Sequence, residues 1–411
     1  MNLLIINQPL NNRGDESAHK ALVRSLSHRF QQSKITILFV GANPDSVEQF
    51  KVKKENVVYV NLQHQKGYGL IYPSVTRNGH YWMMHVHPTG RKILHYFKEA
   101  DWVVCAPGGI CMGGFQNWGH LFYLKIAKYL GKRIAYYGRS FGPFPTETYD
   151  NRCFKEISID LLHYFSFLSI RDAKTEALAN KLGVKYISTV DTAFLDSPKV
   201  EVPLEVKEII GDDRYVVFVP NLLIWHYAYK DRILKETVIR FFTSIYNAII
   251  RRFPNHKIIM LPQTFNYTRE DDNDINFFHD LQFSIADKRL RVLSDKYSSD
   301  IQQTIISGAD CMIGARYHSV VFAINNNVPF VALSYEHKIS GLLEKLNKQD
   351  CMIDINHALD SNDTIRDCVT NFNKILENVK KDPVVQKKAK EIAGKCFESL
   401  AKELLETNSL S

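Results

Sequence analysis

Short apolar runs alternate with amphipathic stretches over the first half of the chain. The apolar runs have the length and β-branched composition of buried strands, and the amphipathic stretches repeat their apolar positions with helical spacing. Strands that alternate with helices are typical of βαβ units around a mostly parallel sheet. The pattern predicts strands at residues 3–6, 34–40, 56–60, 102–106, 133–137, 166–170 and 186–188. It predicts helices at 15–30, through Ile93, Leu94 and Phe97, and at 121–130 and 174–182.

The alternation breaks at residues 196–203, where two prolines and several charges show no periodicity, as in a linker. It restarts with predicted strands at 215–219, 257–261, 311–314 and 330–333, and helices at 235–252, 301–309 and 319–325. We therefore predict an α/β fold with two Rossmann-like doubly wound domains, residues 1–196 and 204–375, and a helical segment, 376–411, that could pack back on the first domain. Ligands of such folds bind outside the carboxyl ends of the strands, and we expect a cleft between the domains.

The composition is that of a globular protein, with 45% hydrophobic and 23% charged residues. The net charge is +8, but the basic residues are scattered, which disfavours nucleic-acid binding and suits an anionic substrate or an anionic membrane surface. Seven cysteines without a CxxC pair predict reduced, buried thiols, and we expect no metal site. The first residues lack the basic start of a signal peptide, and no apolar run could cross a membrane, so a cytoplasmic protein is expected.

Two glycine-containing segments directly follow strands of the first predicted domain. In the first, Asp15 follows Gly14 and is either a helix cap or a carboxylate that binds an acceptor hydroxyl or acts as a base. In the second, residues 107–114, Gly108 and Gly109 belong either to a loop whose amides contact a phosphate or a sugar, or to a plain turn. This segment matches neither a P-loop nor a dinucleotide fingerprint.

Charged side chains also stand at the ends of later strands in this domain. Arg139 lies between two glycines, and Arg171 precedes Asp172 at the start of a predicted helix. An arginine there either pairs with a loop carboxylate or binds a phosphate or carboxylate with its planar fork. For Asp191, near the predicted domain junction, structural and functional roles remain equally open.

The most specific segment lies in the second predicted domain, at residues 314–319, between a strand and a helix. Arg316 and His318 stand together at the helix N-terminus, where the dipole and the unbonded amides favour anions. Glu336 and Lys338 follow the next strand and add a carboxylate and a cation at the same sheet edge.

Cations at several strand ends suit a small, highly charged donor such as a phosphorylated carboxylate. Metal catalysis is not expected, because these strand ends carry no cluster of metal-ligand residues. The acidic run at residues 271–274 lies in a polar loop and is interpreted as solvated.

Taken in order, these segments resemble the polysaccharide pyruvyl transferase family. The resemblance covers about residues 7 to 345, and its most specific part is the R-x-H-S element. At the position of Arg139, relatives commonly carry glutamine. The matching elements are Gly14-Asp15-Glu16, Gly108-Gly109, Gly138-Arg139-Ser140-Phe141-Gly142-Pro143, Arg171-Asp172, Asp191-Thr192-Ala193-Phe194, Arg316-Tyr317-His318-Ser319 and Lys338.

The resemblance implies a GT-B-like fold and the transfer of a pyruvyl group from phosphoenolpyruvate to two sugar hydroxyls as a cyclic ketal. The reaction would serve bacterial capsule or exopolysaccharide biosynthesis, with phosphoenolpyruvate as a co-substrate and no cofactor. On this hypothesis, His318 protonates the donor methylene or neutralises its phosphate, and Asp15 is a weaker candidate for the base. The expected donor-binding residues are Arg316, Arg171, Lys338, Arg139 and Ser319, and those expected near the substrate are Gly108, Gly109, Asp191 and Glu336.

Two other functions remain open on the sequence. One is a GT-B glycosyltransferase with a nucleotide-sugar donor, since fold does not decide function. The other is a catalytically silent assembly component of a polysaccharide pathway, against which the presence of both Arg316 and His318 argues.

The acceptor is not identified by the sequence. It could be a lipid-linked oligosaccharide, a nucleotide sugar or a finished polymer, and we expect the first domain to bind the acceptor and the second to bind the donor. Residues 61–95 are rich in histidine and aromatic residues and are interpreted either as rings that stack on a sugar or as a partly buried loop. Tyr81, Trp82 and Phe97 are expected to be exposed, which would permit contact with the inner face of a membrane; the oligomeric state is open.

Overall fold

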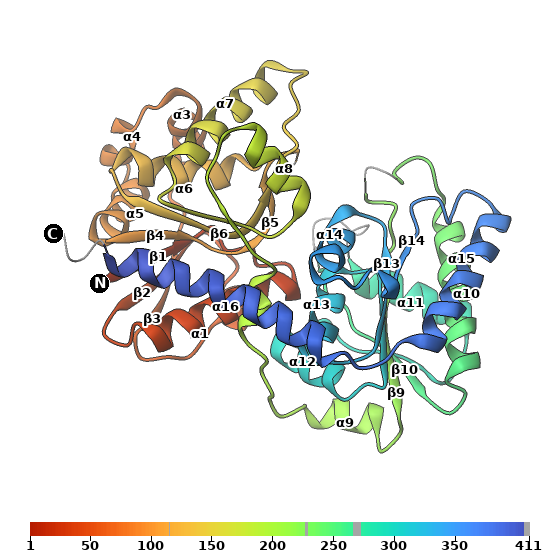
Figure 1. Cartoon of the computed structure of the whole chain (residues 1–411). Helices are drawn as coiled ribbons and strands as arrows, with labels where there is room; N and C mark the ends of the chain where they lie inside the picture. The colour runs from red at the N-terminus through yellow and green to blue at the C-terminus, as the bar shows by residue number, and fades with distance from the viewer. Residues whose placement is uncertain (115, 227–228, 266–272, 407–411) are drawn as a thin grey trace. The chain divides into compact units, whose positions relative to one another are not determined.

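The computed structural model describes residues 1–411 except 115, 227–228, 266–272 and 407–411 (Figure 1). The chain forms two compact units. The first contains residues 1–10, 18–195 and 392–411, and the second contains residues 11–17 and 196–391. None of the described helices has the length and hydropathy that a membrane crossing requires.

The first unit is built on a parallel sheet of eight strands. Its order is β3-β2-β1-β4-β6-β7-β8, and β5 pairs with β6 beside this path. The order reverses between β1 and β4, so the carboxyl ends of these strands form a switch point at which ligands of such sheets bind. The strands are β1 (Asn2–Ile6), β2 (Lys34–Val40), β3 (Val57–Leu62), β4 (Trp102–Cys105), β5 (Gly108–Met112), β6 (Arg133–Phe141), β7 (Phe167–Ile170) and β8 (Ile187–Ser188).

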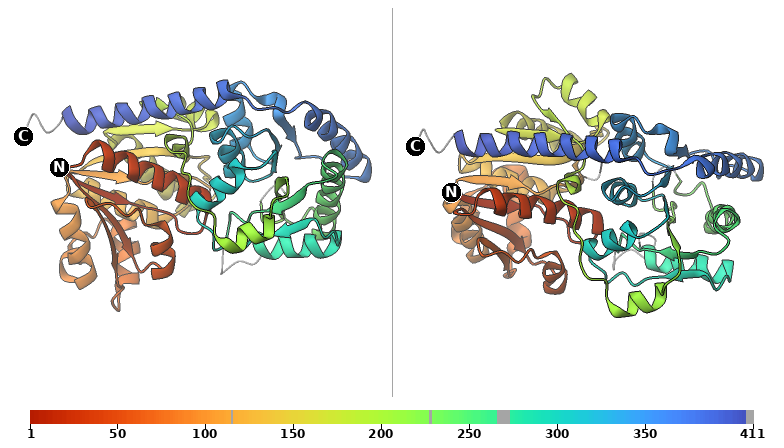
Figure 2. Two further views of the ribbon diagram at one scale, coloured as in Figure 1. Left: turned by 90° about the horizontal axis from the view of Figure 1, so that it is seen from below. Right: turned by 60° about the horizontal axis from the view of Figure 1, so that its bottom comes forward.

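Helices cover both faces of this sheet because side chains alternate between its faces along each strand. Leu4 and Ile6 of β1 pack in the core beneath α3, α5, α6 and α7, whereas Leu3 and Ile5 pack beneath α1 and the last part of α16 (Figures 1 and 2). The helices are α1 (Arg13–Arg29), α2 (Pro44–Phe50), α3 (Tyr68–Asn78), α4 (Trp82–Val86), α5 (Pro88–Glu99), α6 (Trp118–Tyr129), α7 (Tyr149–Tyr164), α8 (Ala173–Lys181) and α16 (Pro383–Glu406), with a 3₁₀ turn, η1 (Thr192–Leu195).

The second unit holds a six-stranded parallel sheet with the order β11-β10-β9-β12-β13-β14. This is the strand order of a Rossmann sheet, with its switch point between β9 and β12. The strands are β9 (Tyr215–Val219), β10 (Lys257–Met260), β11 (Leu290–Val292), β12 (Cys311–Gly314), β13 (Phe330–Ser334) and β14 (Met352–Asp354). The helices are α9 (Leu204–Ile210), α10 (Lys235–Arg252), α11 (Asp274–Ile285), α12 (Ser299–Ser307), α13 (Tyr317–Asn325), α14 (His337–Leu346) and α15 (Asn362–Asn378), with a 3₁₀ turn, η3 (Gln349–Cys351).

The structure confirms the predicted α/β class and corrects three local predictions. Residues 107–114 are not a plain loop, because Gly108–Met112 pairs with β6 as β5. Residues 61–95 are not a loop either, since α3 and α4 form there. The helix predicted through Phe97 is confirmed as α5, but Phe97 is buried and not exposed, while Trp82 is exposed. Asp15 lies in the first turn of α1 and does not cap it, because the helix begins at Arg13.

His19 of α1 is a buried histidine beside the sheet of the first unit. Its Nε2 lies 3.0 Å from the hydroxyl of Tyr59, and the two rings meet edge to face. Burial, with a smaller contribution from Lys20, lowers the pKa of His19 from 6.5 to about 3. Protonation of this ring therefore opposes folding.

We expect His19 to make the protein less stable as the pH falls below 6.5. Below that pH the unfolded chain binds a proton at this histidine, whereas the folded chain does not. The free energy of unfolding therefore falls by about 1.4 kcal/mol for each unit by which the pH decreases. His19→Gln should reduce the slope of the free energy of unfolding against pH by the contribution of one proton. Urea titrations between pH 7 and 4 measure this slope. His95→Gln, at an exposed position, is the control substitution. An unchanged slope in His19→Gln would show that the ring is not held neutral.

Candidate active site

The connection between β12 and α13 carries the residues that the sequence singled out most clearly. The turn is tight at Gly314, where a Cβ atom would come within 2.0 Å of the Ser319 hydroxyl oxygen. That hydroxyl donates a 2.6 Å hydrogen bond to the carbonyl of Arg316, which occupies the N-cap position of α13. Arg316 and His318 are both largely buried. Two potential cations thus stand at a helix N-terminus beside the switch point of the sheet, an arrangement suited to an anion.

Asp274, the first residue of α11, holds the guanidinium of Arg316. The Nε and Nη2 atoms of Arg316 donate to one carboxylate oxygen of Asp274 at 3.1 and 2.5 Å. The other oxygen accepts from the backbone N–H groups of Gln263 and Thr264, both at 2.9 Å. Asp274 is buried, so the prediction that residues 271–274 form a solvated run is wrong for this residue. Residues 271 and 272 lie outside the described part of the chain.

An aromatic pair adjoins the same arginine. The guanidinium carbon of Arg316 lies 5.5 Å from the centre of the Trp225 ring. Trp225 donates from its indole nitrogen to the Asn221 side chain at 2.9 Å, and its ring meets Tyr335 nearly edge to face. The sequence prediction missed Trp225, Asn221 and Asp274. A tryptophan six residues after a strand was the available signal, but its spacing says nothing about Arg316.

The ring of His318 packs directly on Gly14. A Cβ atom at position 14 would lie 1.8 Å from Nδ1 of His318, so only glycine fits there. The amide of Gly14 donates to the side-chain oxygen of Asn12 at 2.7 Å, and Asn12 forms an isolated antiparallel bridge with Thr264. The Gly14-Asp15-Glu16 element, predicted within the first domain, thus belongs to the second unit and contacts His318. Asp15 follows at a half-buried position.

A buried ion pair fixes this segment to the second unit. Arg13 donates to Glu16 at 2.7 Å and to the carbonyl of Asp295 at 2.5 Å. The other carboxylate oxygen of Glu16 accepts from the amide of Ser299, at the start of α12, at 3.1 Å. A carboxylate at a helix N-terminus is favoured by the helix dipole. Segment 11–17 is therefore held by charge as well as by packing.

Glu336 and Lys338 form a second charged cluster after β13. The Lys338 ammonium lies 3.3 Å from the Glu336 carboxylate, and both side chains are largely buried. Burial raises the pKa of Glu336, but the electrostatic effects of Lys338 and His226 together lower it by more. The pKa of Glu336 therefore lies below its usual value. The His226 ring lies 5.3 Å from Tyr335, the residue before Glu336. The cluster is thus adjacent in sequence to the aromatic pair beside Arg316.

The first unit buries Arg139 completely at the end of β6. Its guanidinium donates to the carbonyls of Ala106, Asn7 and Gly109 and lies 3.2 Å from the sulfur of Cys111. These contacts tie the ends of neighbouring strands together. The donor contact expected for Arg139 stays a prediction, to which the structure adds this connecting role.

Arg171 forms a buried ion pair with Asp191, so two residues predicted separately meet in the first unit. Asp172 caps α8 through the amide of Thr175, as the sequence predicted. A Cβ atom added at Gly108 would lie 3.2 Å from Nη2 of Arg139, whereas a Cβ atom added at Gly109 would meet no atom within 4 Å. The roles of these residues towards a substrate stay predictions.

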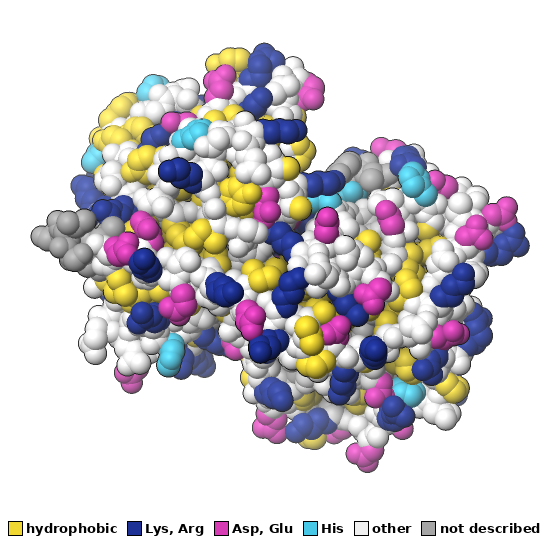
Figure 3. Space-filling model, viewed as in Figure 1, with side chains coloured by type: hydrophobic (Ala, Val, Ile, Leu, Met, Phe, Trp, Pro, Cys, Tyr) yellow, Lys and Arg dark blue, Asp and Glu magenta, His cyan; other side chains and the backbone are white. Residues whose placement is uncertain are grey.

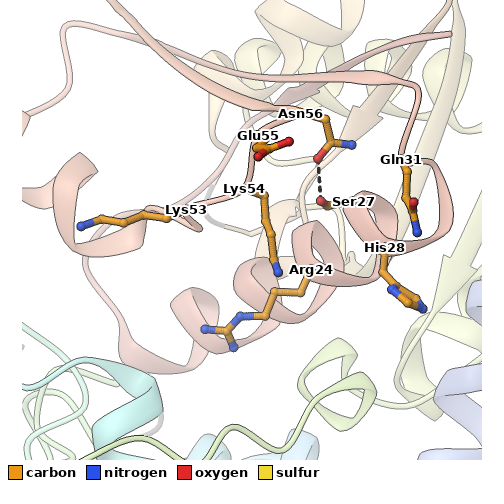
Figure 4. A pocket seen from close by; sticks show the side chains of 8 residues that line it. All are labelled: Arg24, Ser27, His28, Gln31, Lys53, Lys54, Glu55 and Asn56. Atoms are coloured by element: carbon orange, nitrogen blue, oxygen red, sulfur yellow. Dashed lines mark hydrogen bonds between the residues drawn. The ribbon is translucent and has the colours of Figure 1, made fainter.

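An open hollow of about 990 Å³ lies at the other end of the first unit's sheet (Figure 4). It is formed by α1 and the residues before β3, next to the amino ends of the strands, whereas the predicted site residues follow carboxyl ends. None of those predicted residues lines it. The lining residues are Arg24, Ser27, His28, Gln31, Lys53, Lys54, Glu55 and Asn56.

Asp274→Asn should destabilise the protein, because the buried guanidinium of Arg316 then faces a neutral amide. Breaking a buried pair costs about 3–5 kcal/mol. Asp280→Asn, in the same helix but in a half-exposed pair with Lys235, should cost about 0–1 kcal/mol. Urea unfolding followed by circular dichroism measures both changes. Equal losses in the two variants would contradict the structural role assigned to Asp274.

The chain is similar to known proteins over most of its length. The family model of polysaccharide pyruvyl transferases matches residues 12–337. The amylovoran biosynthesis protein AmsJ of Erwinia amylovora is 22% identical over 402 residues, which cover 92% of each chain.

Among solved structures, the UDP-GlcNAc 2-epimerase of Neisseria meningitidis bound to UDP-GlcNAc has a TM-score of 0.56 at 11% identity, covering 99% of this chain and 100% of the other. UGT89C1 of Arabidopsis thaliana has a TM-score of 0.52 at 11% identity, covering 98% and 99%. At such identities the likeness shows the fold alone, which is GT-B-like as predicted. The match over residues 12–337, which include Gly14, Arg139, Arg171, Arg316 and His318, shows that this chain belongs to the polysaccharide pyruvyl transferase family.

Proposed function

We propose that this chain transfers a pyruvyl group from phosphoenolpyruvate to two hydroxyls of a sugar, with release of inorganic phosphate, during capsule or exopolysaccharide biosynthesis. The family membership and the relative named for amylovoran biosynthesis support this role. The observation that carries the proposal is the placement of Arg316 and His318 at the N-terminus of α13. No other described helix start in the second unit combines an arginine and a histidine.

The donor that fits this site is small and carries two anionic groups. Phosphoenolpyruvate has a phosphate and a carboxylate, which the guanidinium of Arg316 and the N-terminal amides of α13 could bind. Asp274 fixes the plane of that guanidinium through two hydrogen bonds. Lys338 supplies a further cation after β13. Ser319 would act indirectly, because its hydroxyl holds the Arg316 carbonyl.

The reaction can be written with His318 as the acid. A proton from His318 adds to the methylene carbon of the donor while one sugar hydroxyl attacks C2, which forms the first C–O bond. The bond from C2 to the phosphate oxygen then breaks, and the second hydroxyl attacks C2 and closes the ketal. The two hydroxyls lose two protons: one replaces the proton taken from His318, and the other leaves on the phosphate. Asp15 is the candidate to accept a hydroxyl proton first, since it follows Gly14.

Incubation of the purified chain with phosphoenolpyruvate and a panel of lipid-linked and nucleotide-linked sugars tests the proposal. We expect phosphate release that depends on one acceptor, and a product whose mass has increased by one pyruvyl ketal. Release of a nucleoside diphosphate from a nucleotide sugar, without any need for phosphoenolpyruvate, would instead establish the glycosyltransferase alternative. Consumption of phosphoenolpyruvate without a ketal product would also contradict the proposal.

Gly14→Ala should impair turnover by displacing the ring of His318, because the added Cβ would overlap Nδ1. Misplacement of a reacting group by about 1 Å costs on the order of 100-fold in rate, and loss of a general acid costs about 10²–10⁴-fold. The double variant Gly14→Ala/His318→Ala should therefore be no slower than His318→Ala alone. Gly394→Ala, where a Cβ meets no atom within 4 Å, is the control. Additive losses in the double variant would refute the coupling.

A further inference from the structure

Three large apolar side chains of the first unit are exposed on α3 and α4. Leu70 on α3 is 73% exposed, and Trp82 and Val86 on α4 are each 62% exposed. Trp82 and Val86 are four residues apart and so lie on one side of their helix. The residue before them, Tyr81, stacks on Tyr129 with ring centres 4.0 Å apart, which fixes α4 on the unit. The apolar side chains are therefore displayed by a rigid element.

Basic residues are frequent in the same part of the chain, and Arg91 lies beside Val86. Residues 61–100 contain five lysines or arginines and one acidic residue, Glu99. Arg91 donates to the carbonyl of Val86 at 3.0 Å, and Lys66 is tied to the end of α4 by a 3.1 Å contact between its carbonyl and His87. Lys66, Arg91 and Lys92 are exposed, and none forms an ion pair with a described residue. Figure 3 shows hydrophobic and histidine side chains close together over α3 and α4, at the upper left.

This surface extends from the carboxyl ends of β2 and β3 toward the amino end of β6, because Tyr81 stacks on Tyr129, the last residue of α6. The segment that leads into α3 leaves the carboxyl end of β3, and His64 packs against Gly41 at the carboxyl end of β2. Asn7 and Arg139, at the ends of β1 and β6, stand at the same edge of the sheet.

We propose that Leu70, Trp82 and Val86, with Lys66, Arg91 and Lys92, form a docking surface for an anionic lipid membrane. Tryptophan has an apolar ring and a polar nitrogen and is favoured at the level of lipid headgroups, where aliphatic neighbours reach the acyl chains. Lysine and arginine beside them are attracted to the negative potential of the lipid surface. Because α4 is short and no described helix could cross a membrane, the contact would be peripheral. The inference goes beyond the proposed reaction and does not depend on it.

Cosedimentation of the full chain with vesicles tests the proposal. Vesicles of phosphatidylcholine that contain phosphatidylglycerol should bind the chain, and vesicles of phosphatidylcholine alone should bind it much more weakly. Arg91→Gln/Lys92→Gln removes two positive charges from the surface and should weaken binding by roughly 30-fold. Trp82→Ala/Val86→Ser should also weaken binding. Circular dichroism checks that the exposed substitutions leave the fold unchanged.

Two control variants alter the same residue types elsewhere. Lys53→Gln/Lys54→Gln removes two charges from the hollow in Figure 4, and Phe283→Ser removes an exposed ring from α11. Both should bind the anionic vesicles as the unchanged chain does. If the Lys53→Gln/Lys54→Gln variant loses vesicle binding and the Arg91→Gln/Lys92→Gln variant does not, the proposed docking surface is wrong.

Fluorescence gives a second measurement. The emission of Trp82 should shift to shorter wavelength on anionic vesicles, and Trp82→Phe should bind the vesicles but lose the shift. No binding to either kind of vesicle, or self-association that the Trp82→Ala/Val86→Ser variant abolishes, would overturn the proposal. Phosphate release with a water-soluble acceptor should be unchanged in the Arg91→Gln/Lys92→Gln variant, so failure of vesicle binding and failure of the proposed reaction can be told apart.

Discussion

The carboxylate of Asp274 is the interaction on which the candidate site depends. One of its oxygens holds the Arg316 guanidinium, and the other accepts the amides of Gln263 and Thr264. A buried carboxylate costs much free energy unless its oxygens are bonded in this way. Thr264 in turn bridges to Asn12, whose side chain holds the amide of Gly14. The orientation of Arg316 and the space for the ring next to it are thus fixed by one connected set of bonds.

Segment 11–17 shows how a few residues can complete a site in another part of the chain. It lies between β1 and the body of α1, yet its contacts are with the second unit. Arg13 and Glu16 form a buried ion pair, and Glu16 also accepts a hydrogen bond from the amide of Ser299 in the first turn of α12. Because the charges of the segment are paired and hydrogen-bonded, it holds Gly14 against the His318 ring, at a point where no side chain would fit. This close packing restricts the orientation of the His318 ring.

The two buried arginines named by the sequence illustrate different uses of one side chain. Arg139 directs its donors to the backbone carbonyls of Ala106, Asn7 and Gly109, and so joins the ends of strands. Arg316 directs two donors to a carboxylate at a helix N-terminus. Five donors in a rigid fork serve both purposes.

The sequence by itself determined the class of the fold and the strand ends at which chemistry-bearing residues stand. Periodicity is a local property, so β9, α10 and β12 were predicted with the bounds that they have in the structure. The same local reading failed where a segment's state depends on a distant neighbour: Gly108–Met112 is a strand because β6 lies beside it.

Only the tertiary structure decided which residues meet. Asp274 and Arg316 are 42 residues apart, and Gly14 and His318 lie almost at opposite ends of the matched segment. No pattern of spacing encodes such pairs, because they follow from the order in which strands assemble in a sheet and from the packing of side chains between elements. The R-x-H-S element could therefore be recognised in the sequence, whereas the carboxylate that orients its arginine and the glycine that receives its histidine ring had to be found in the fold.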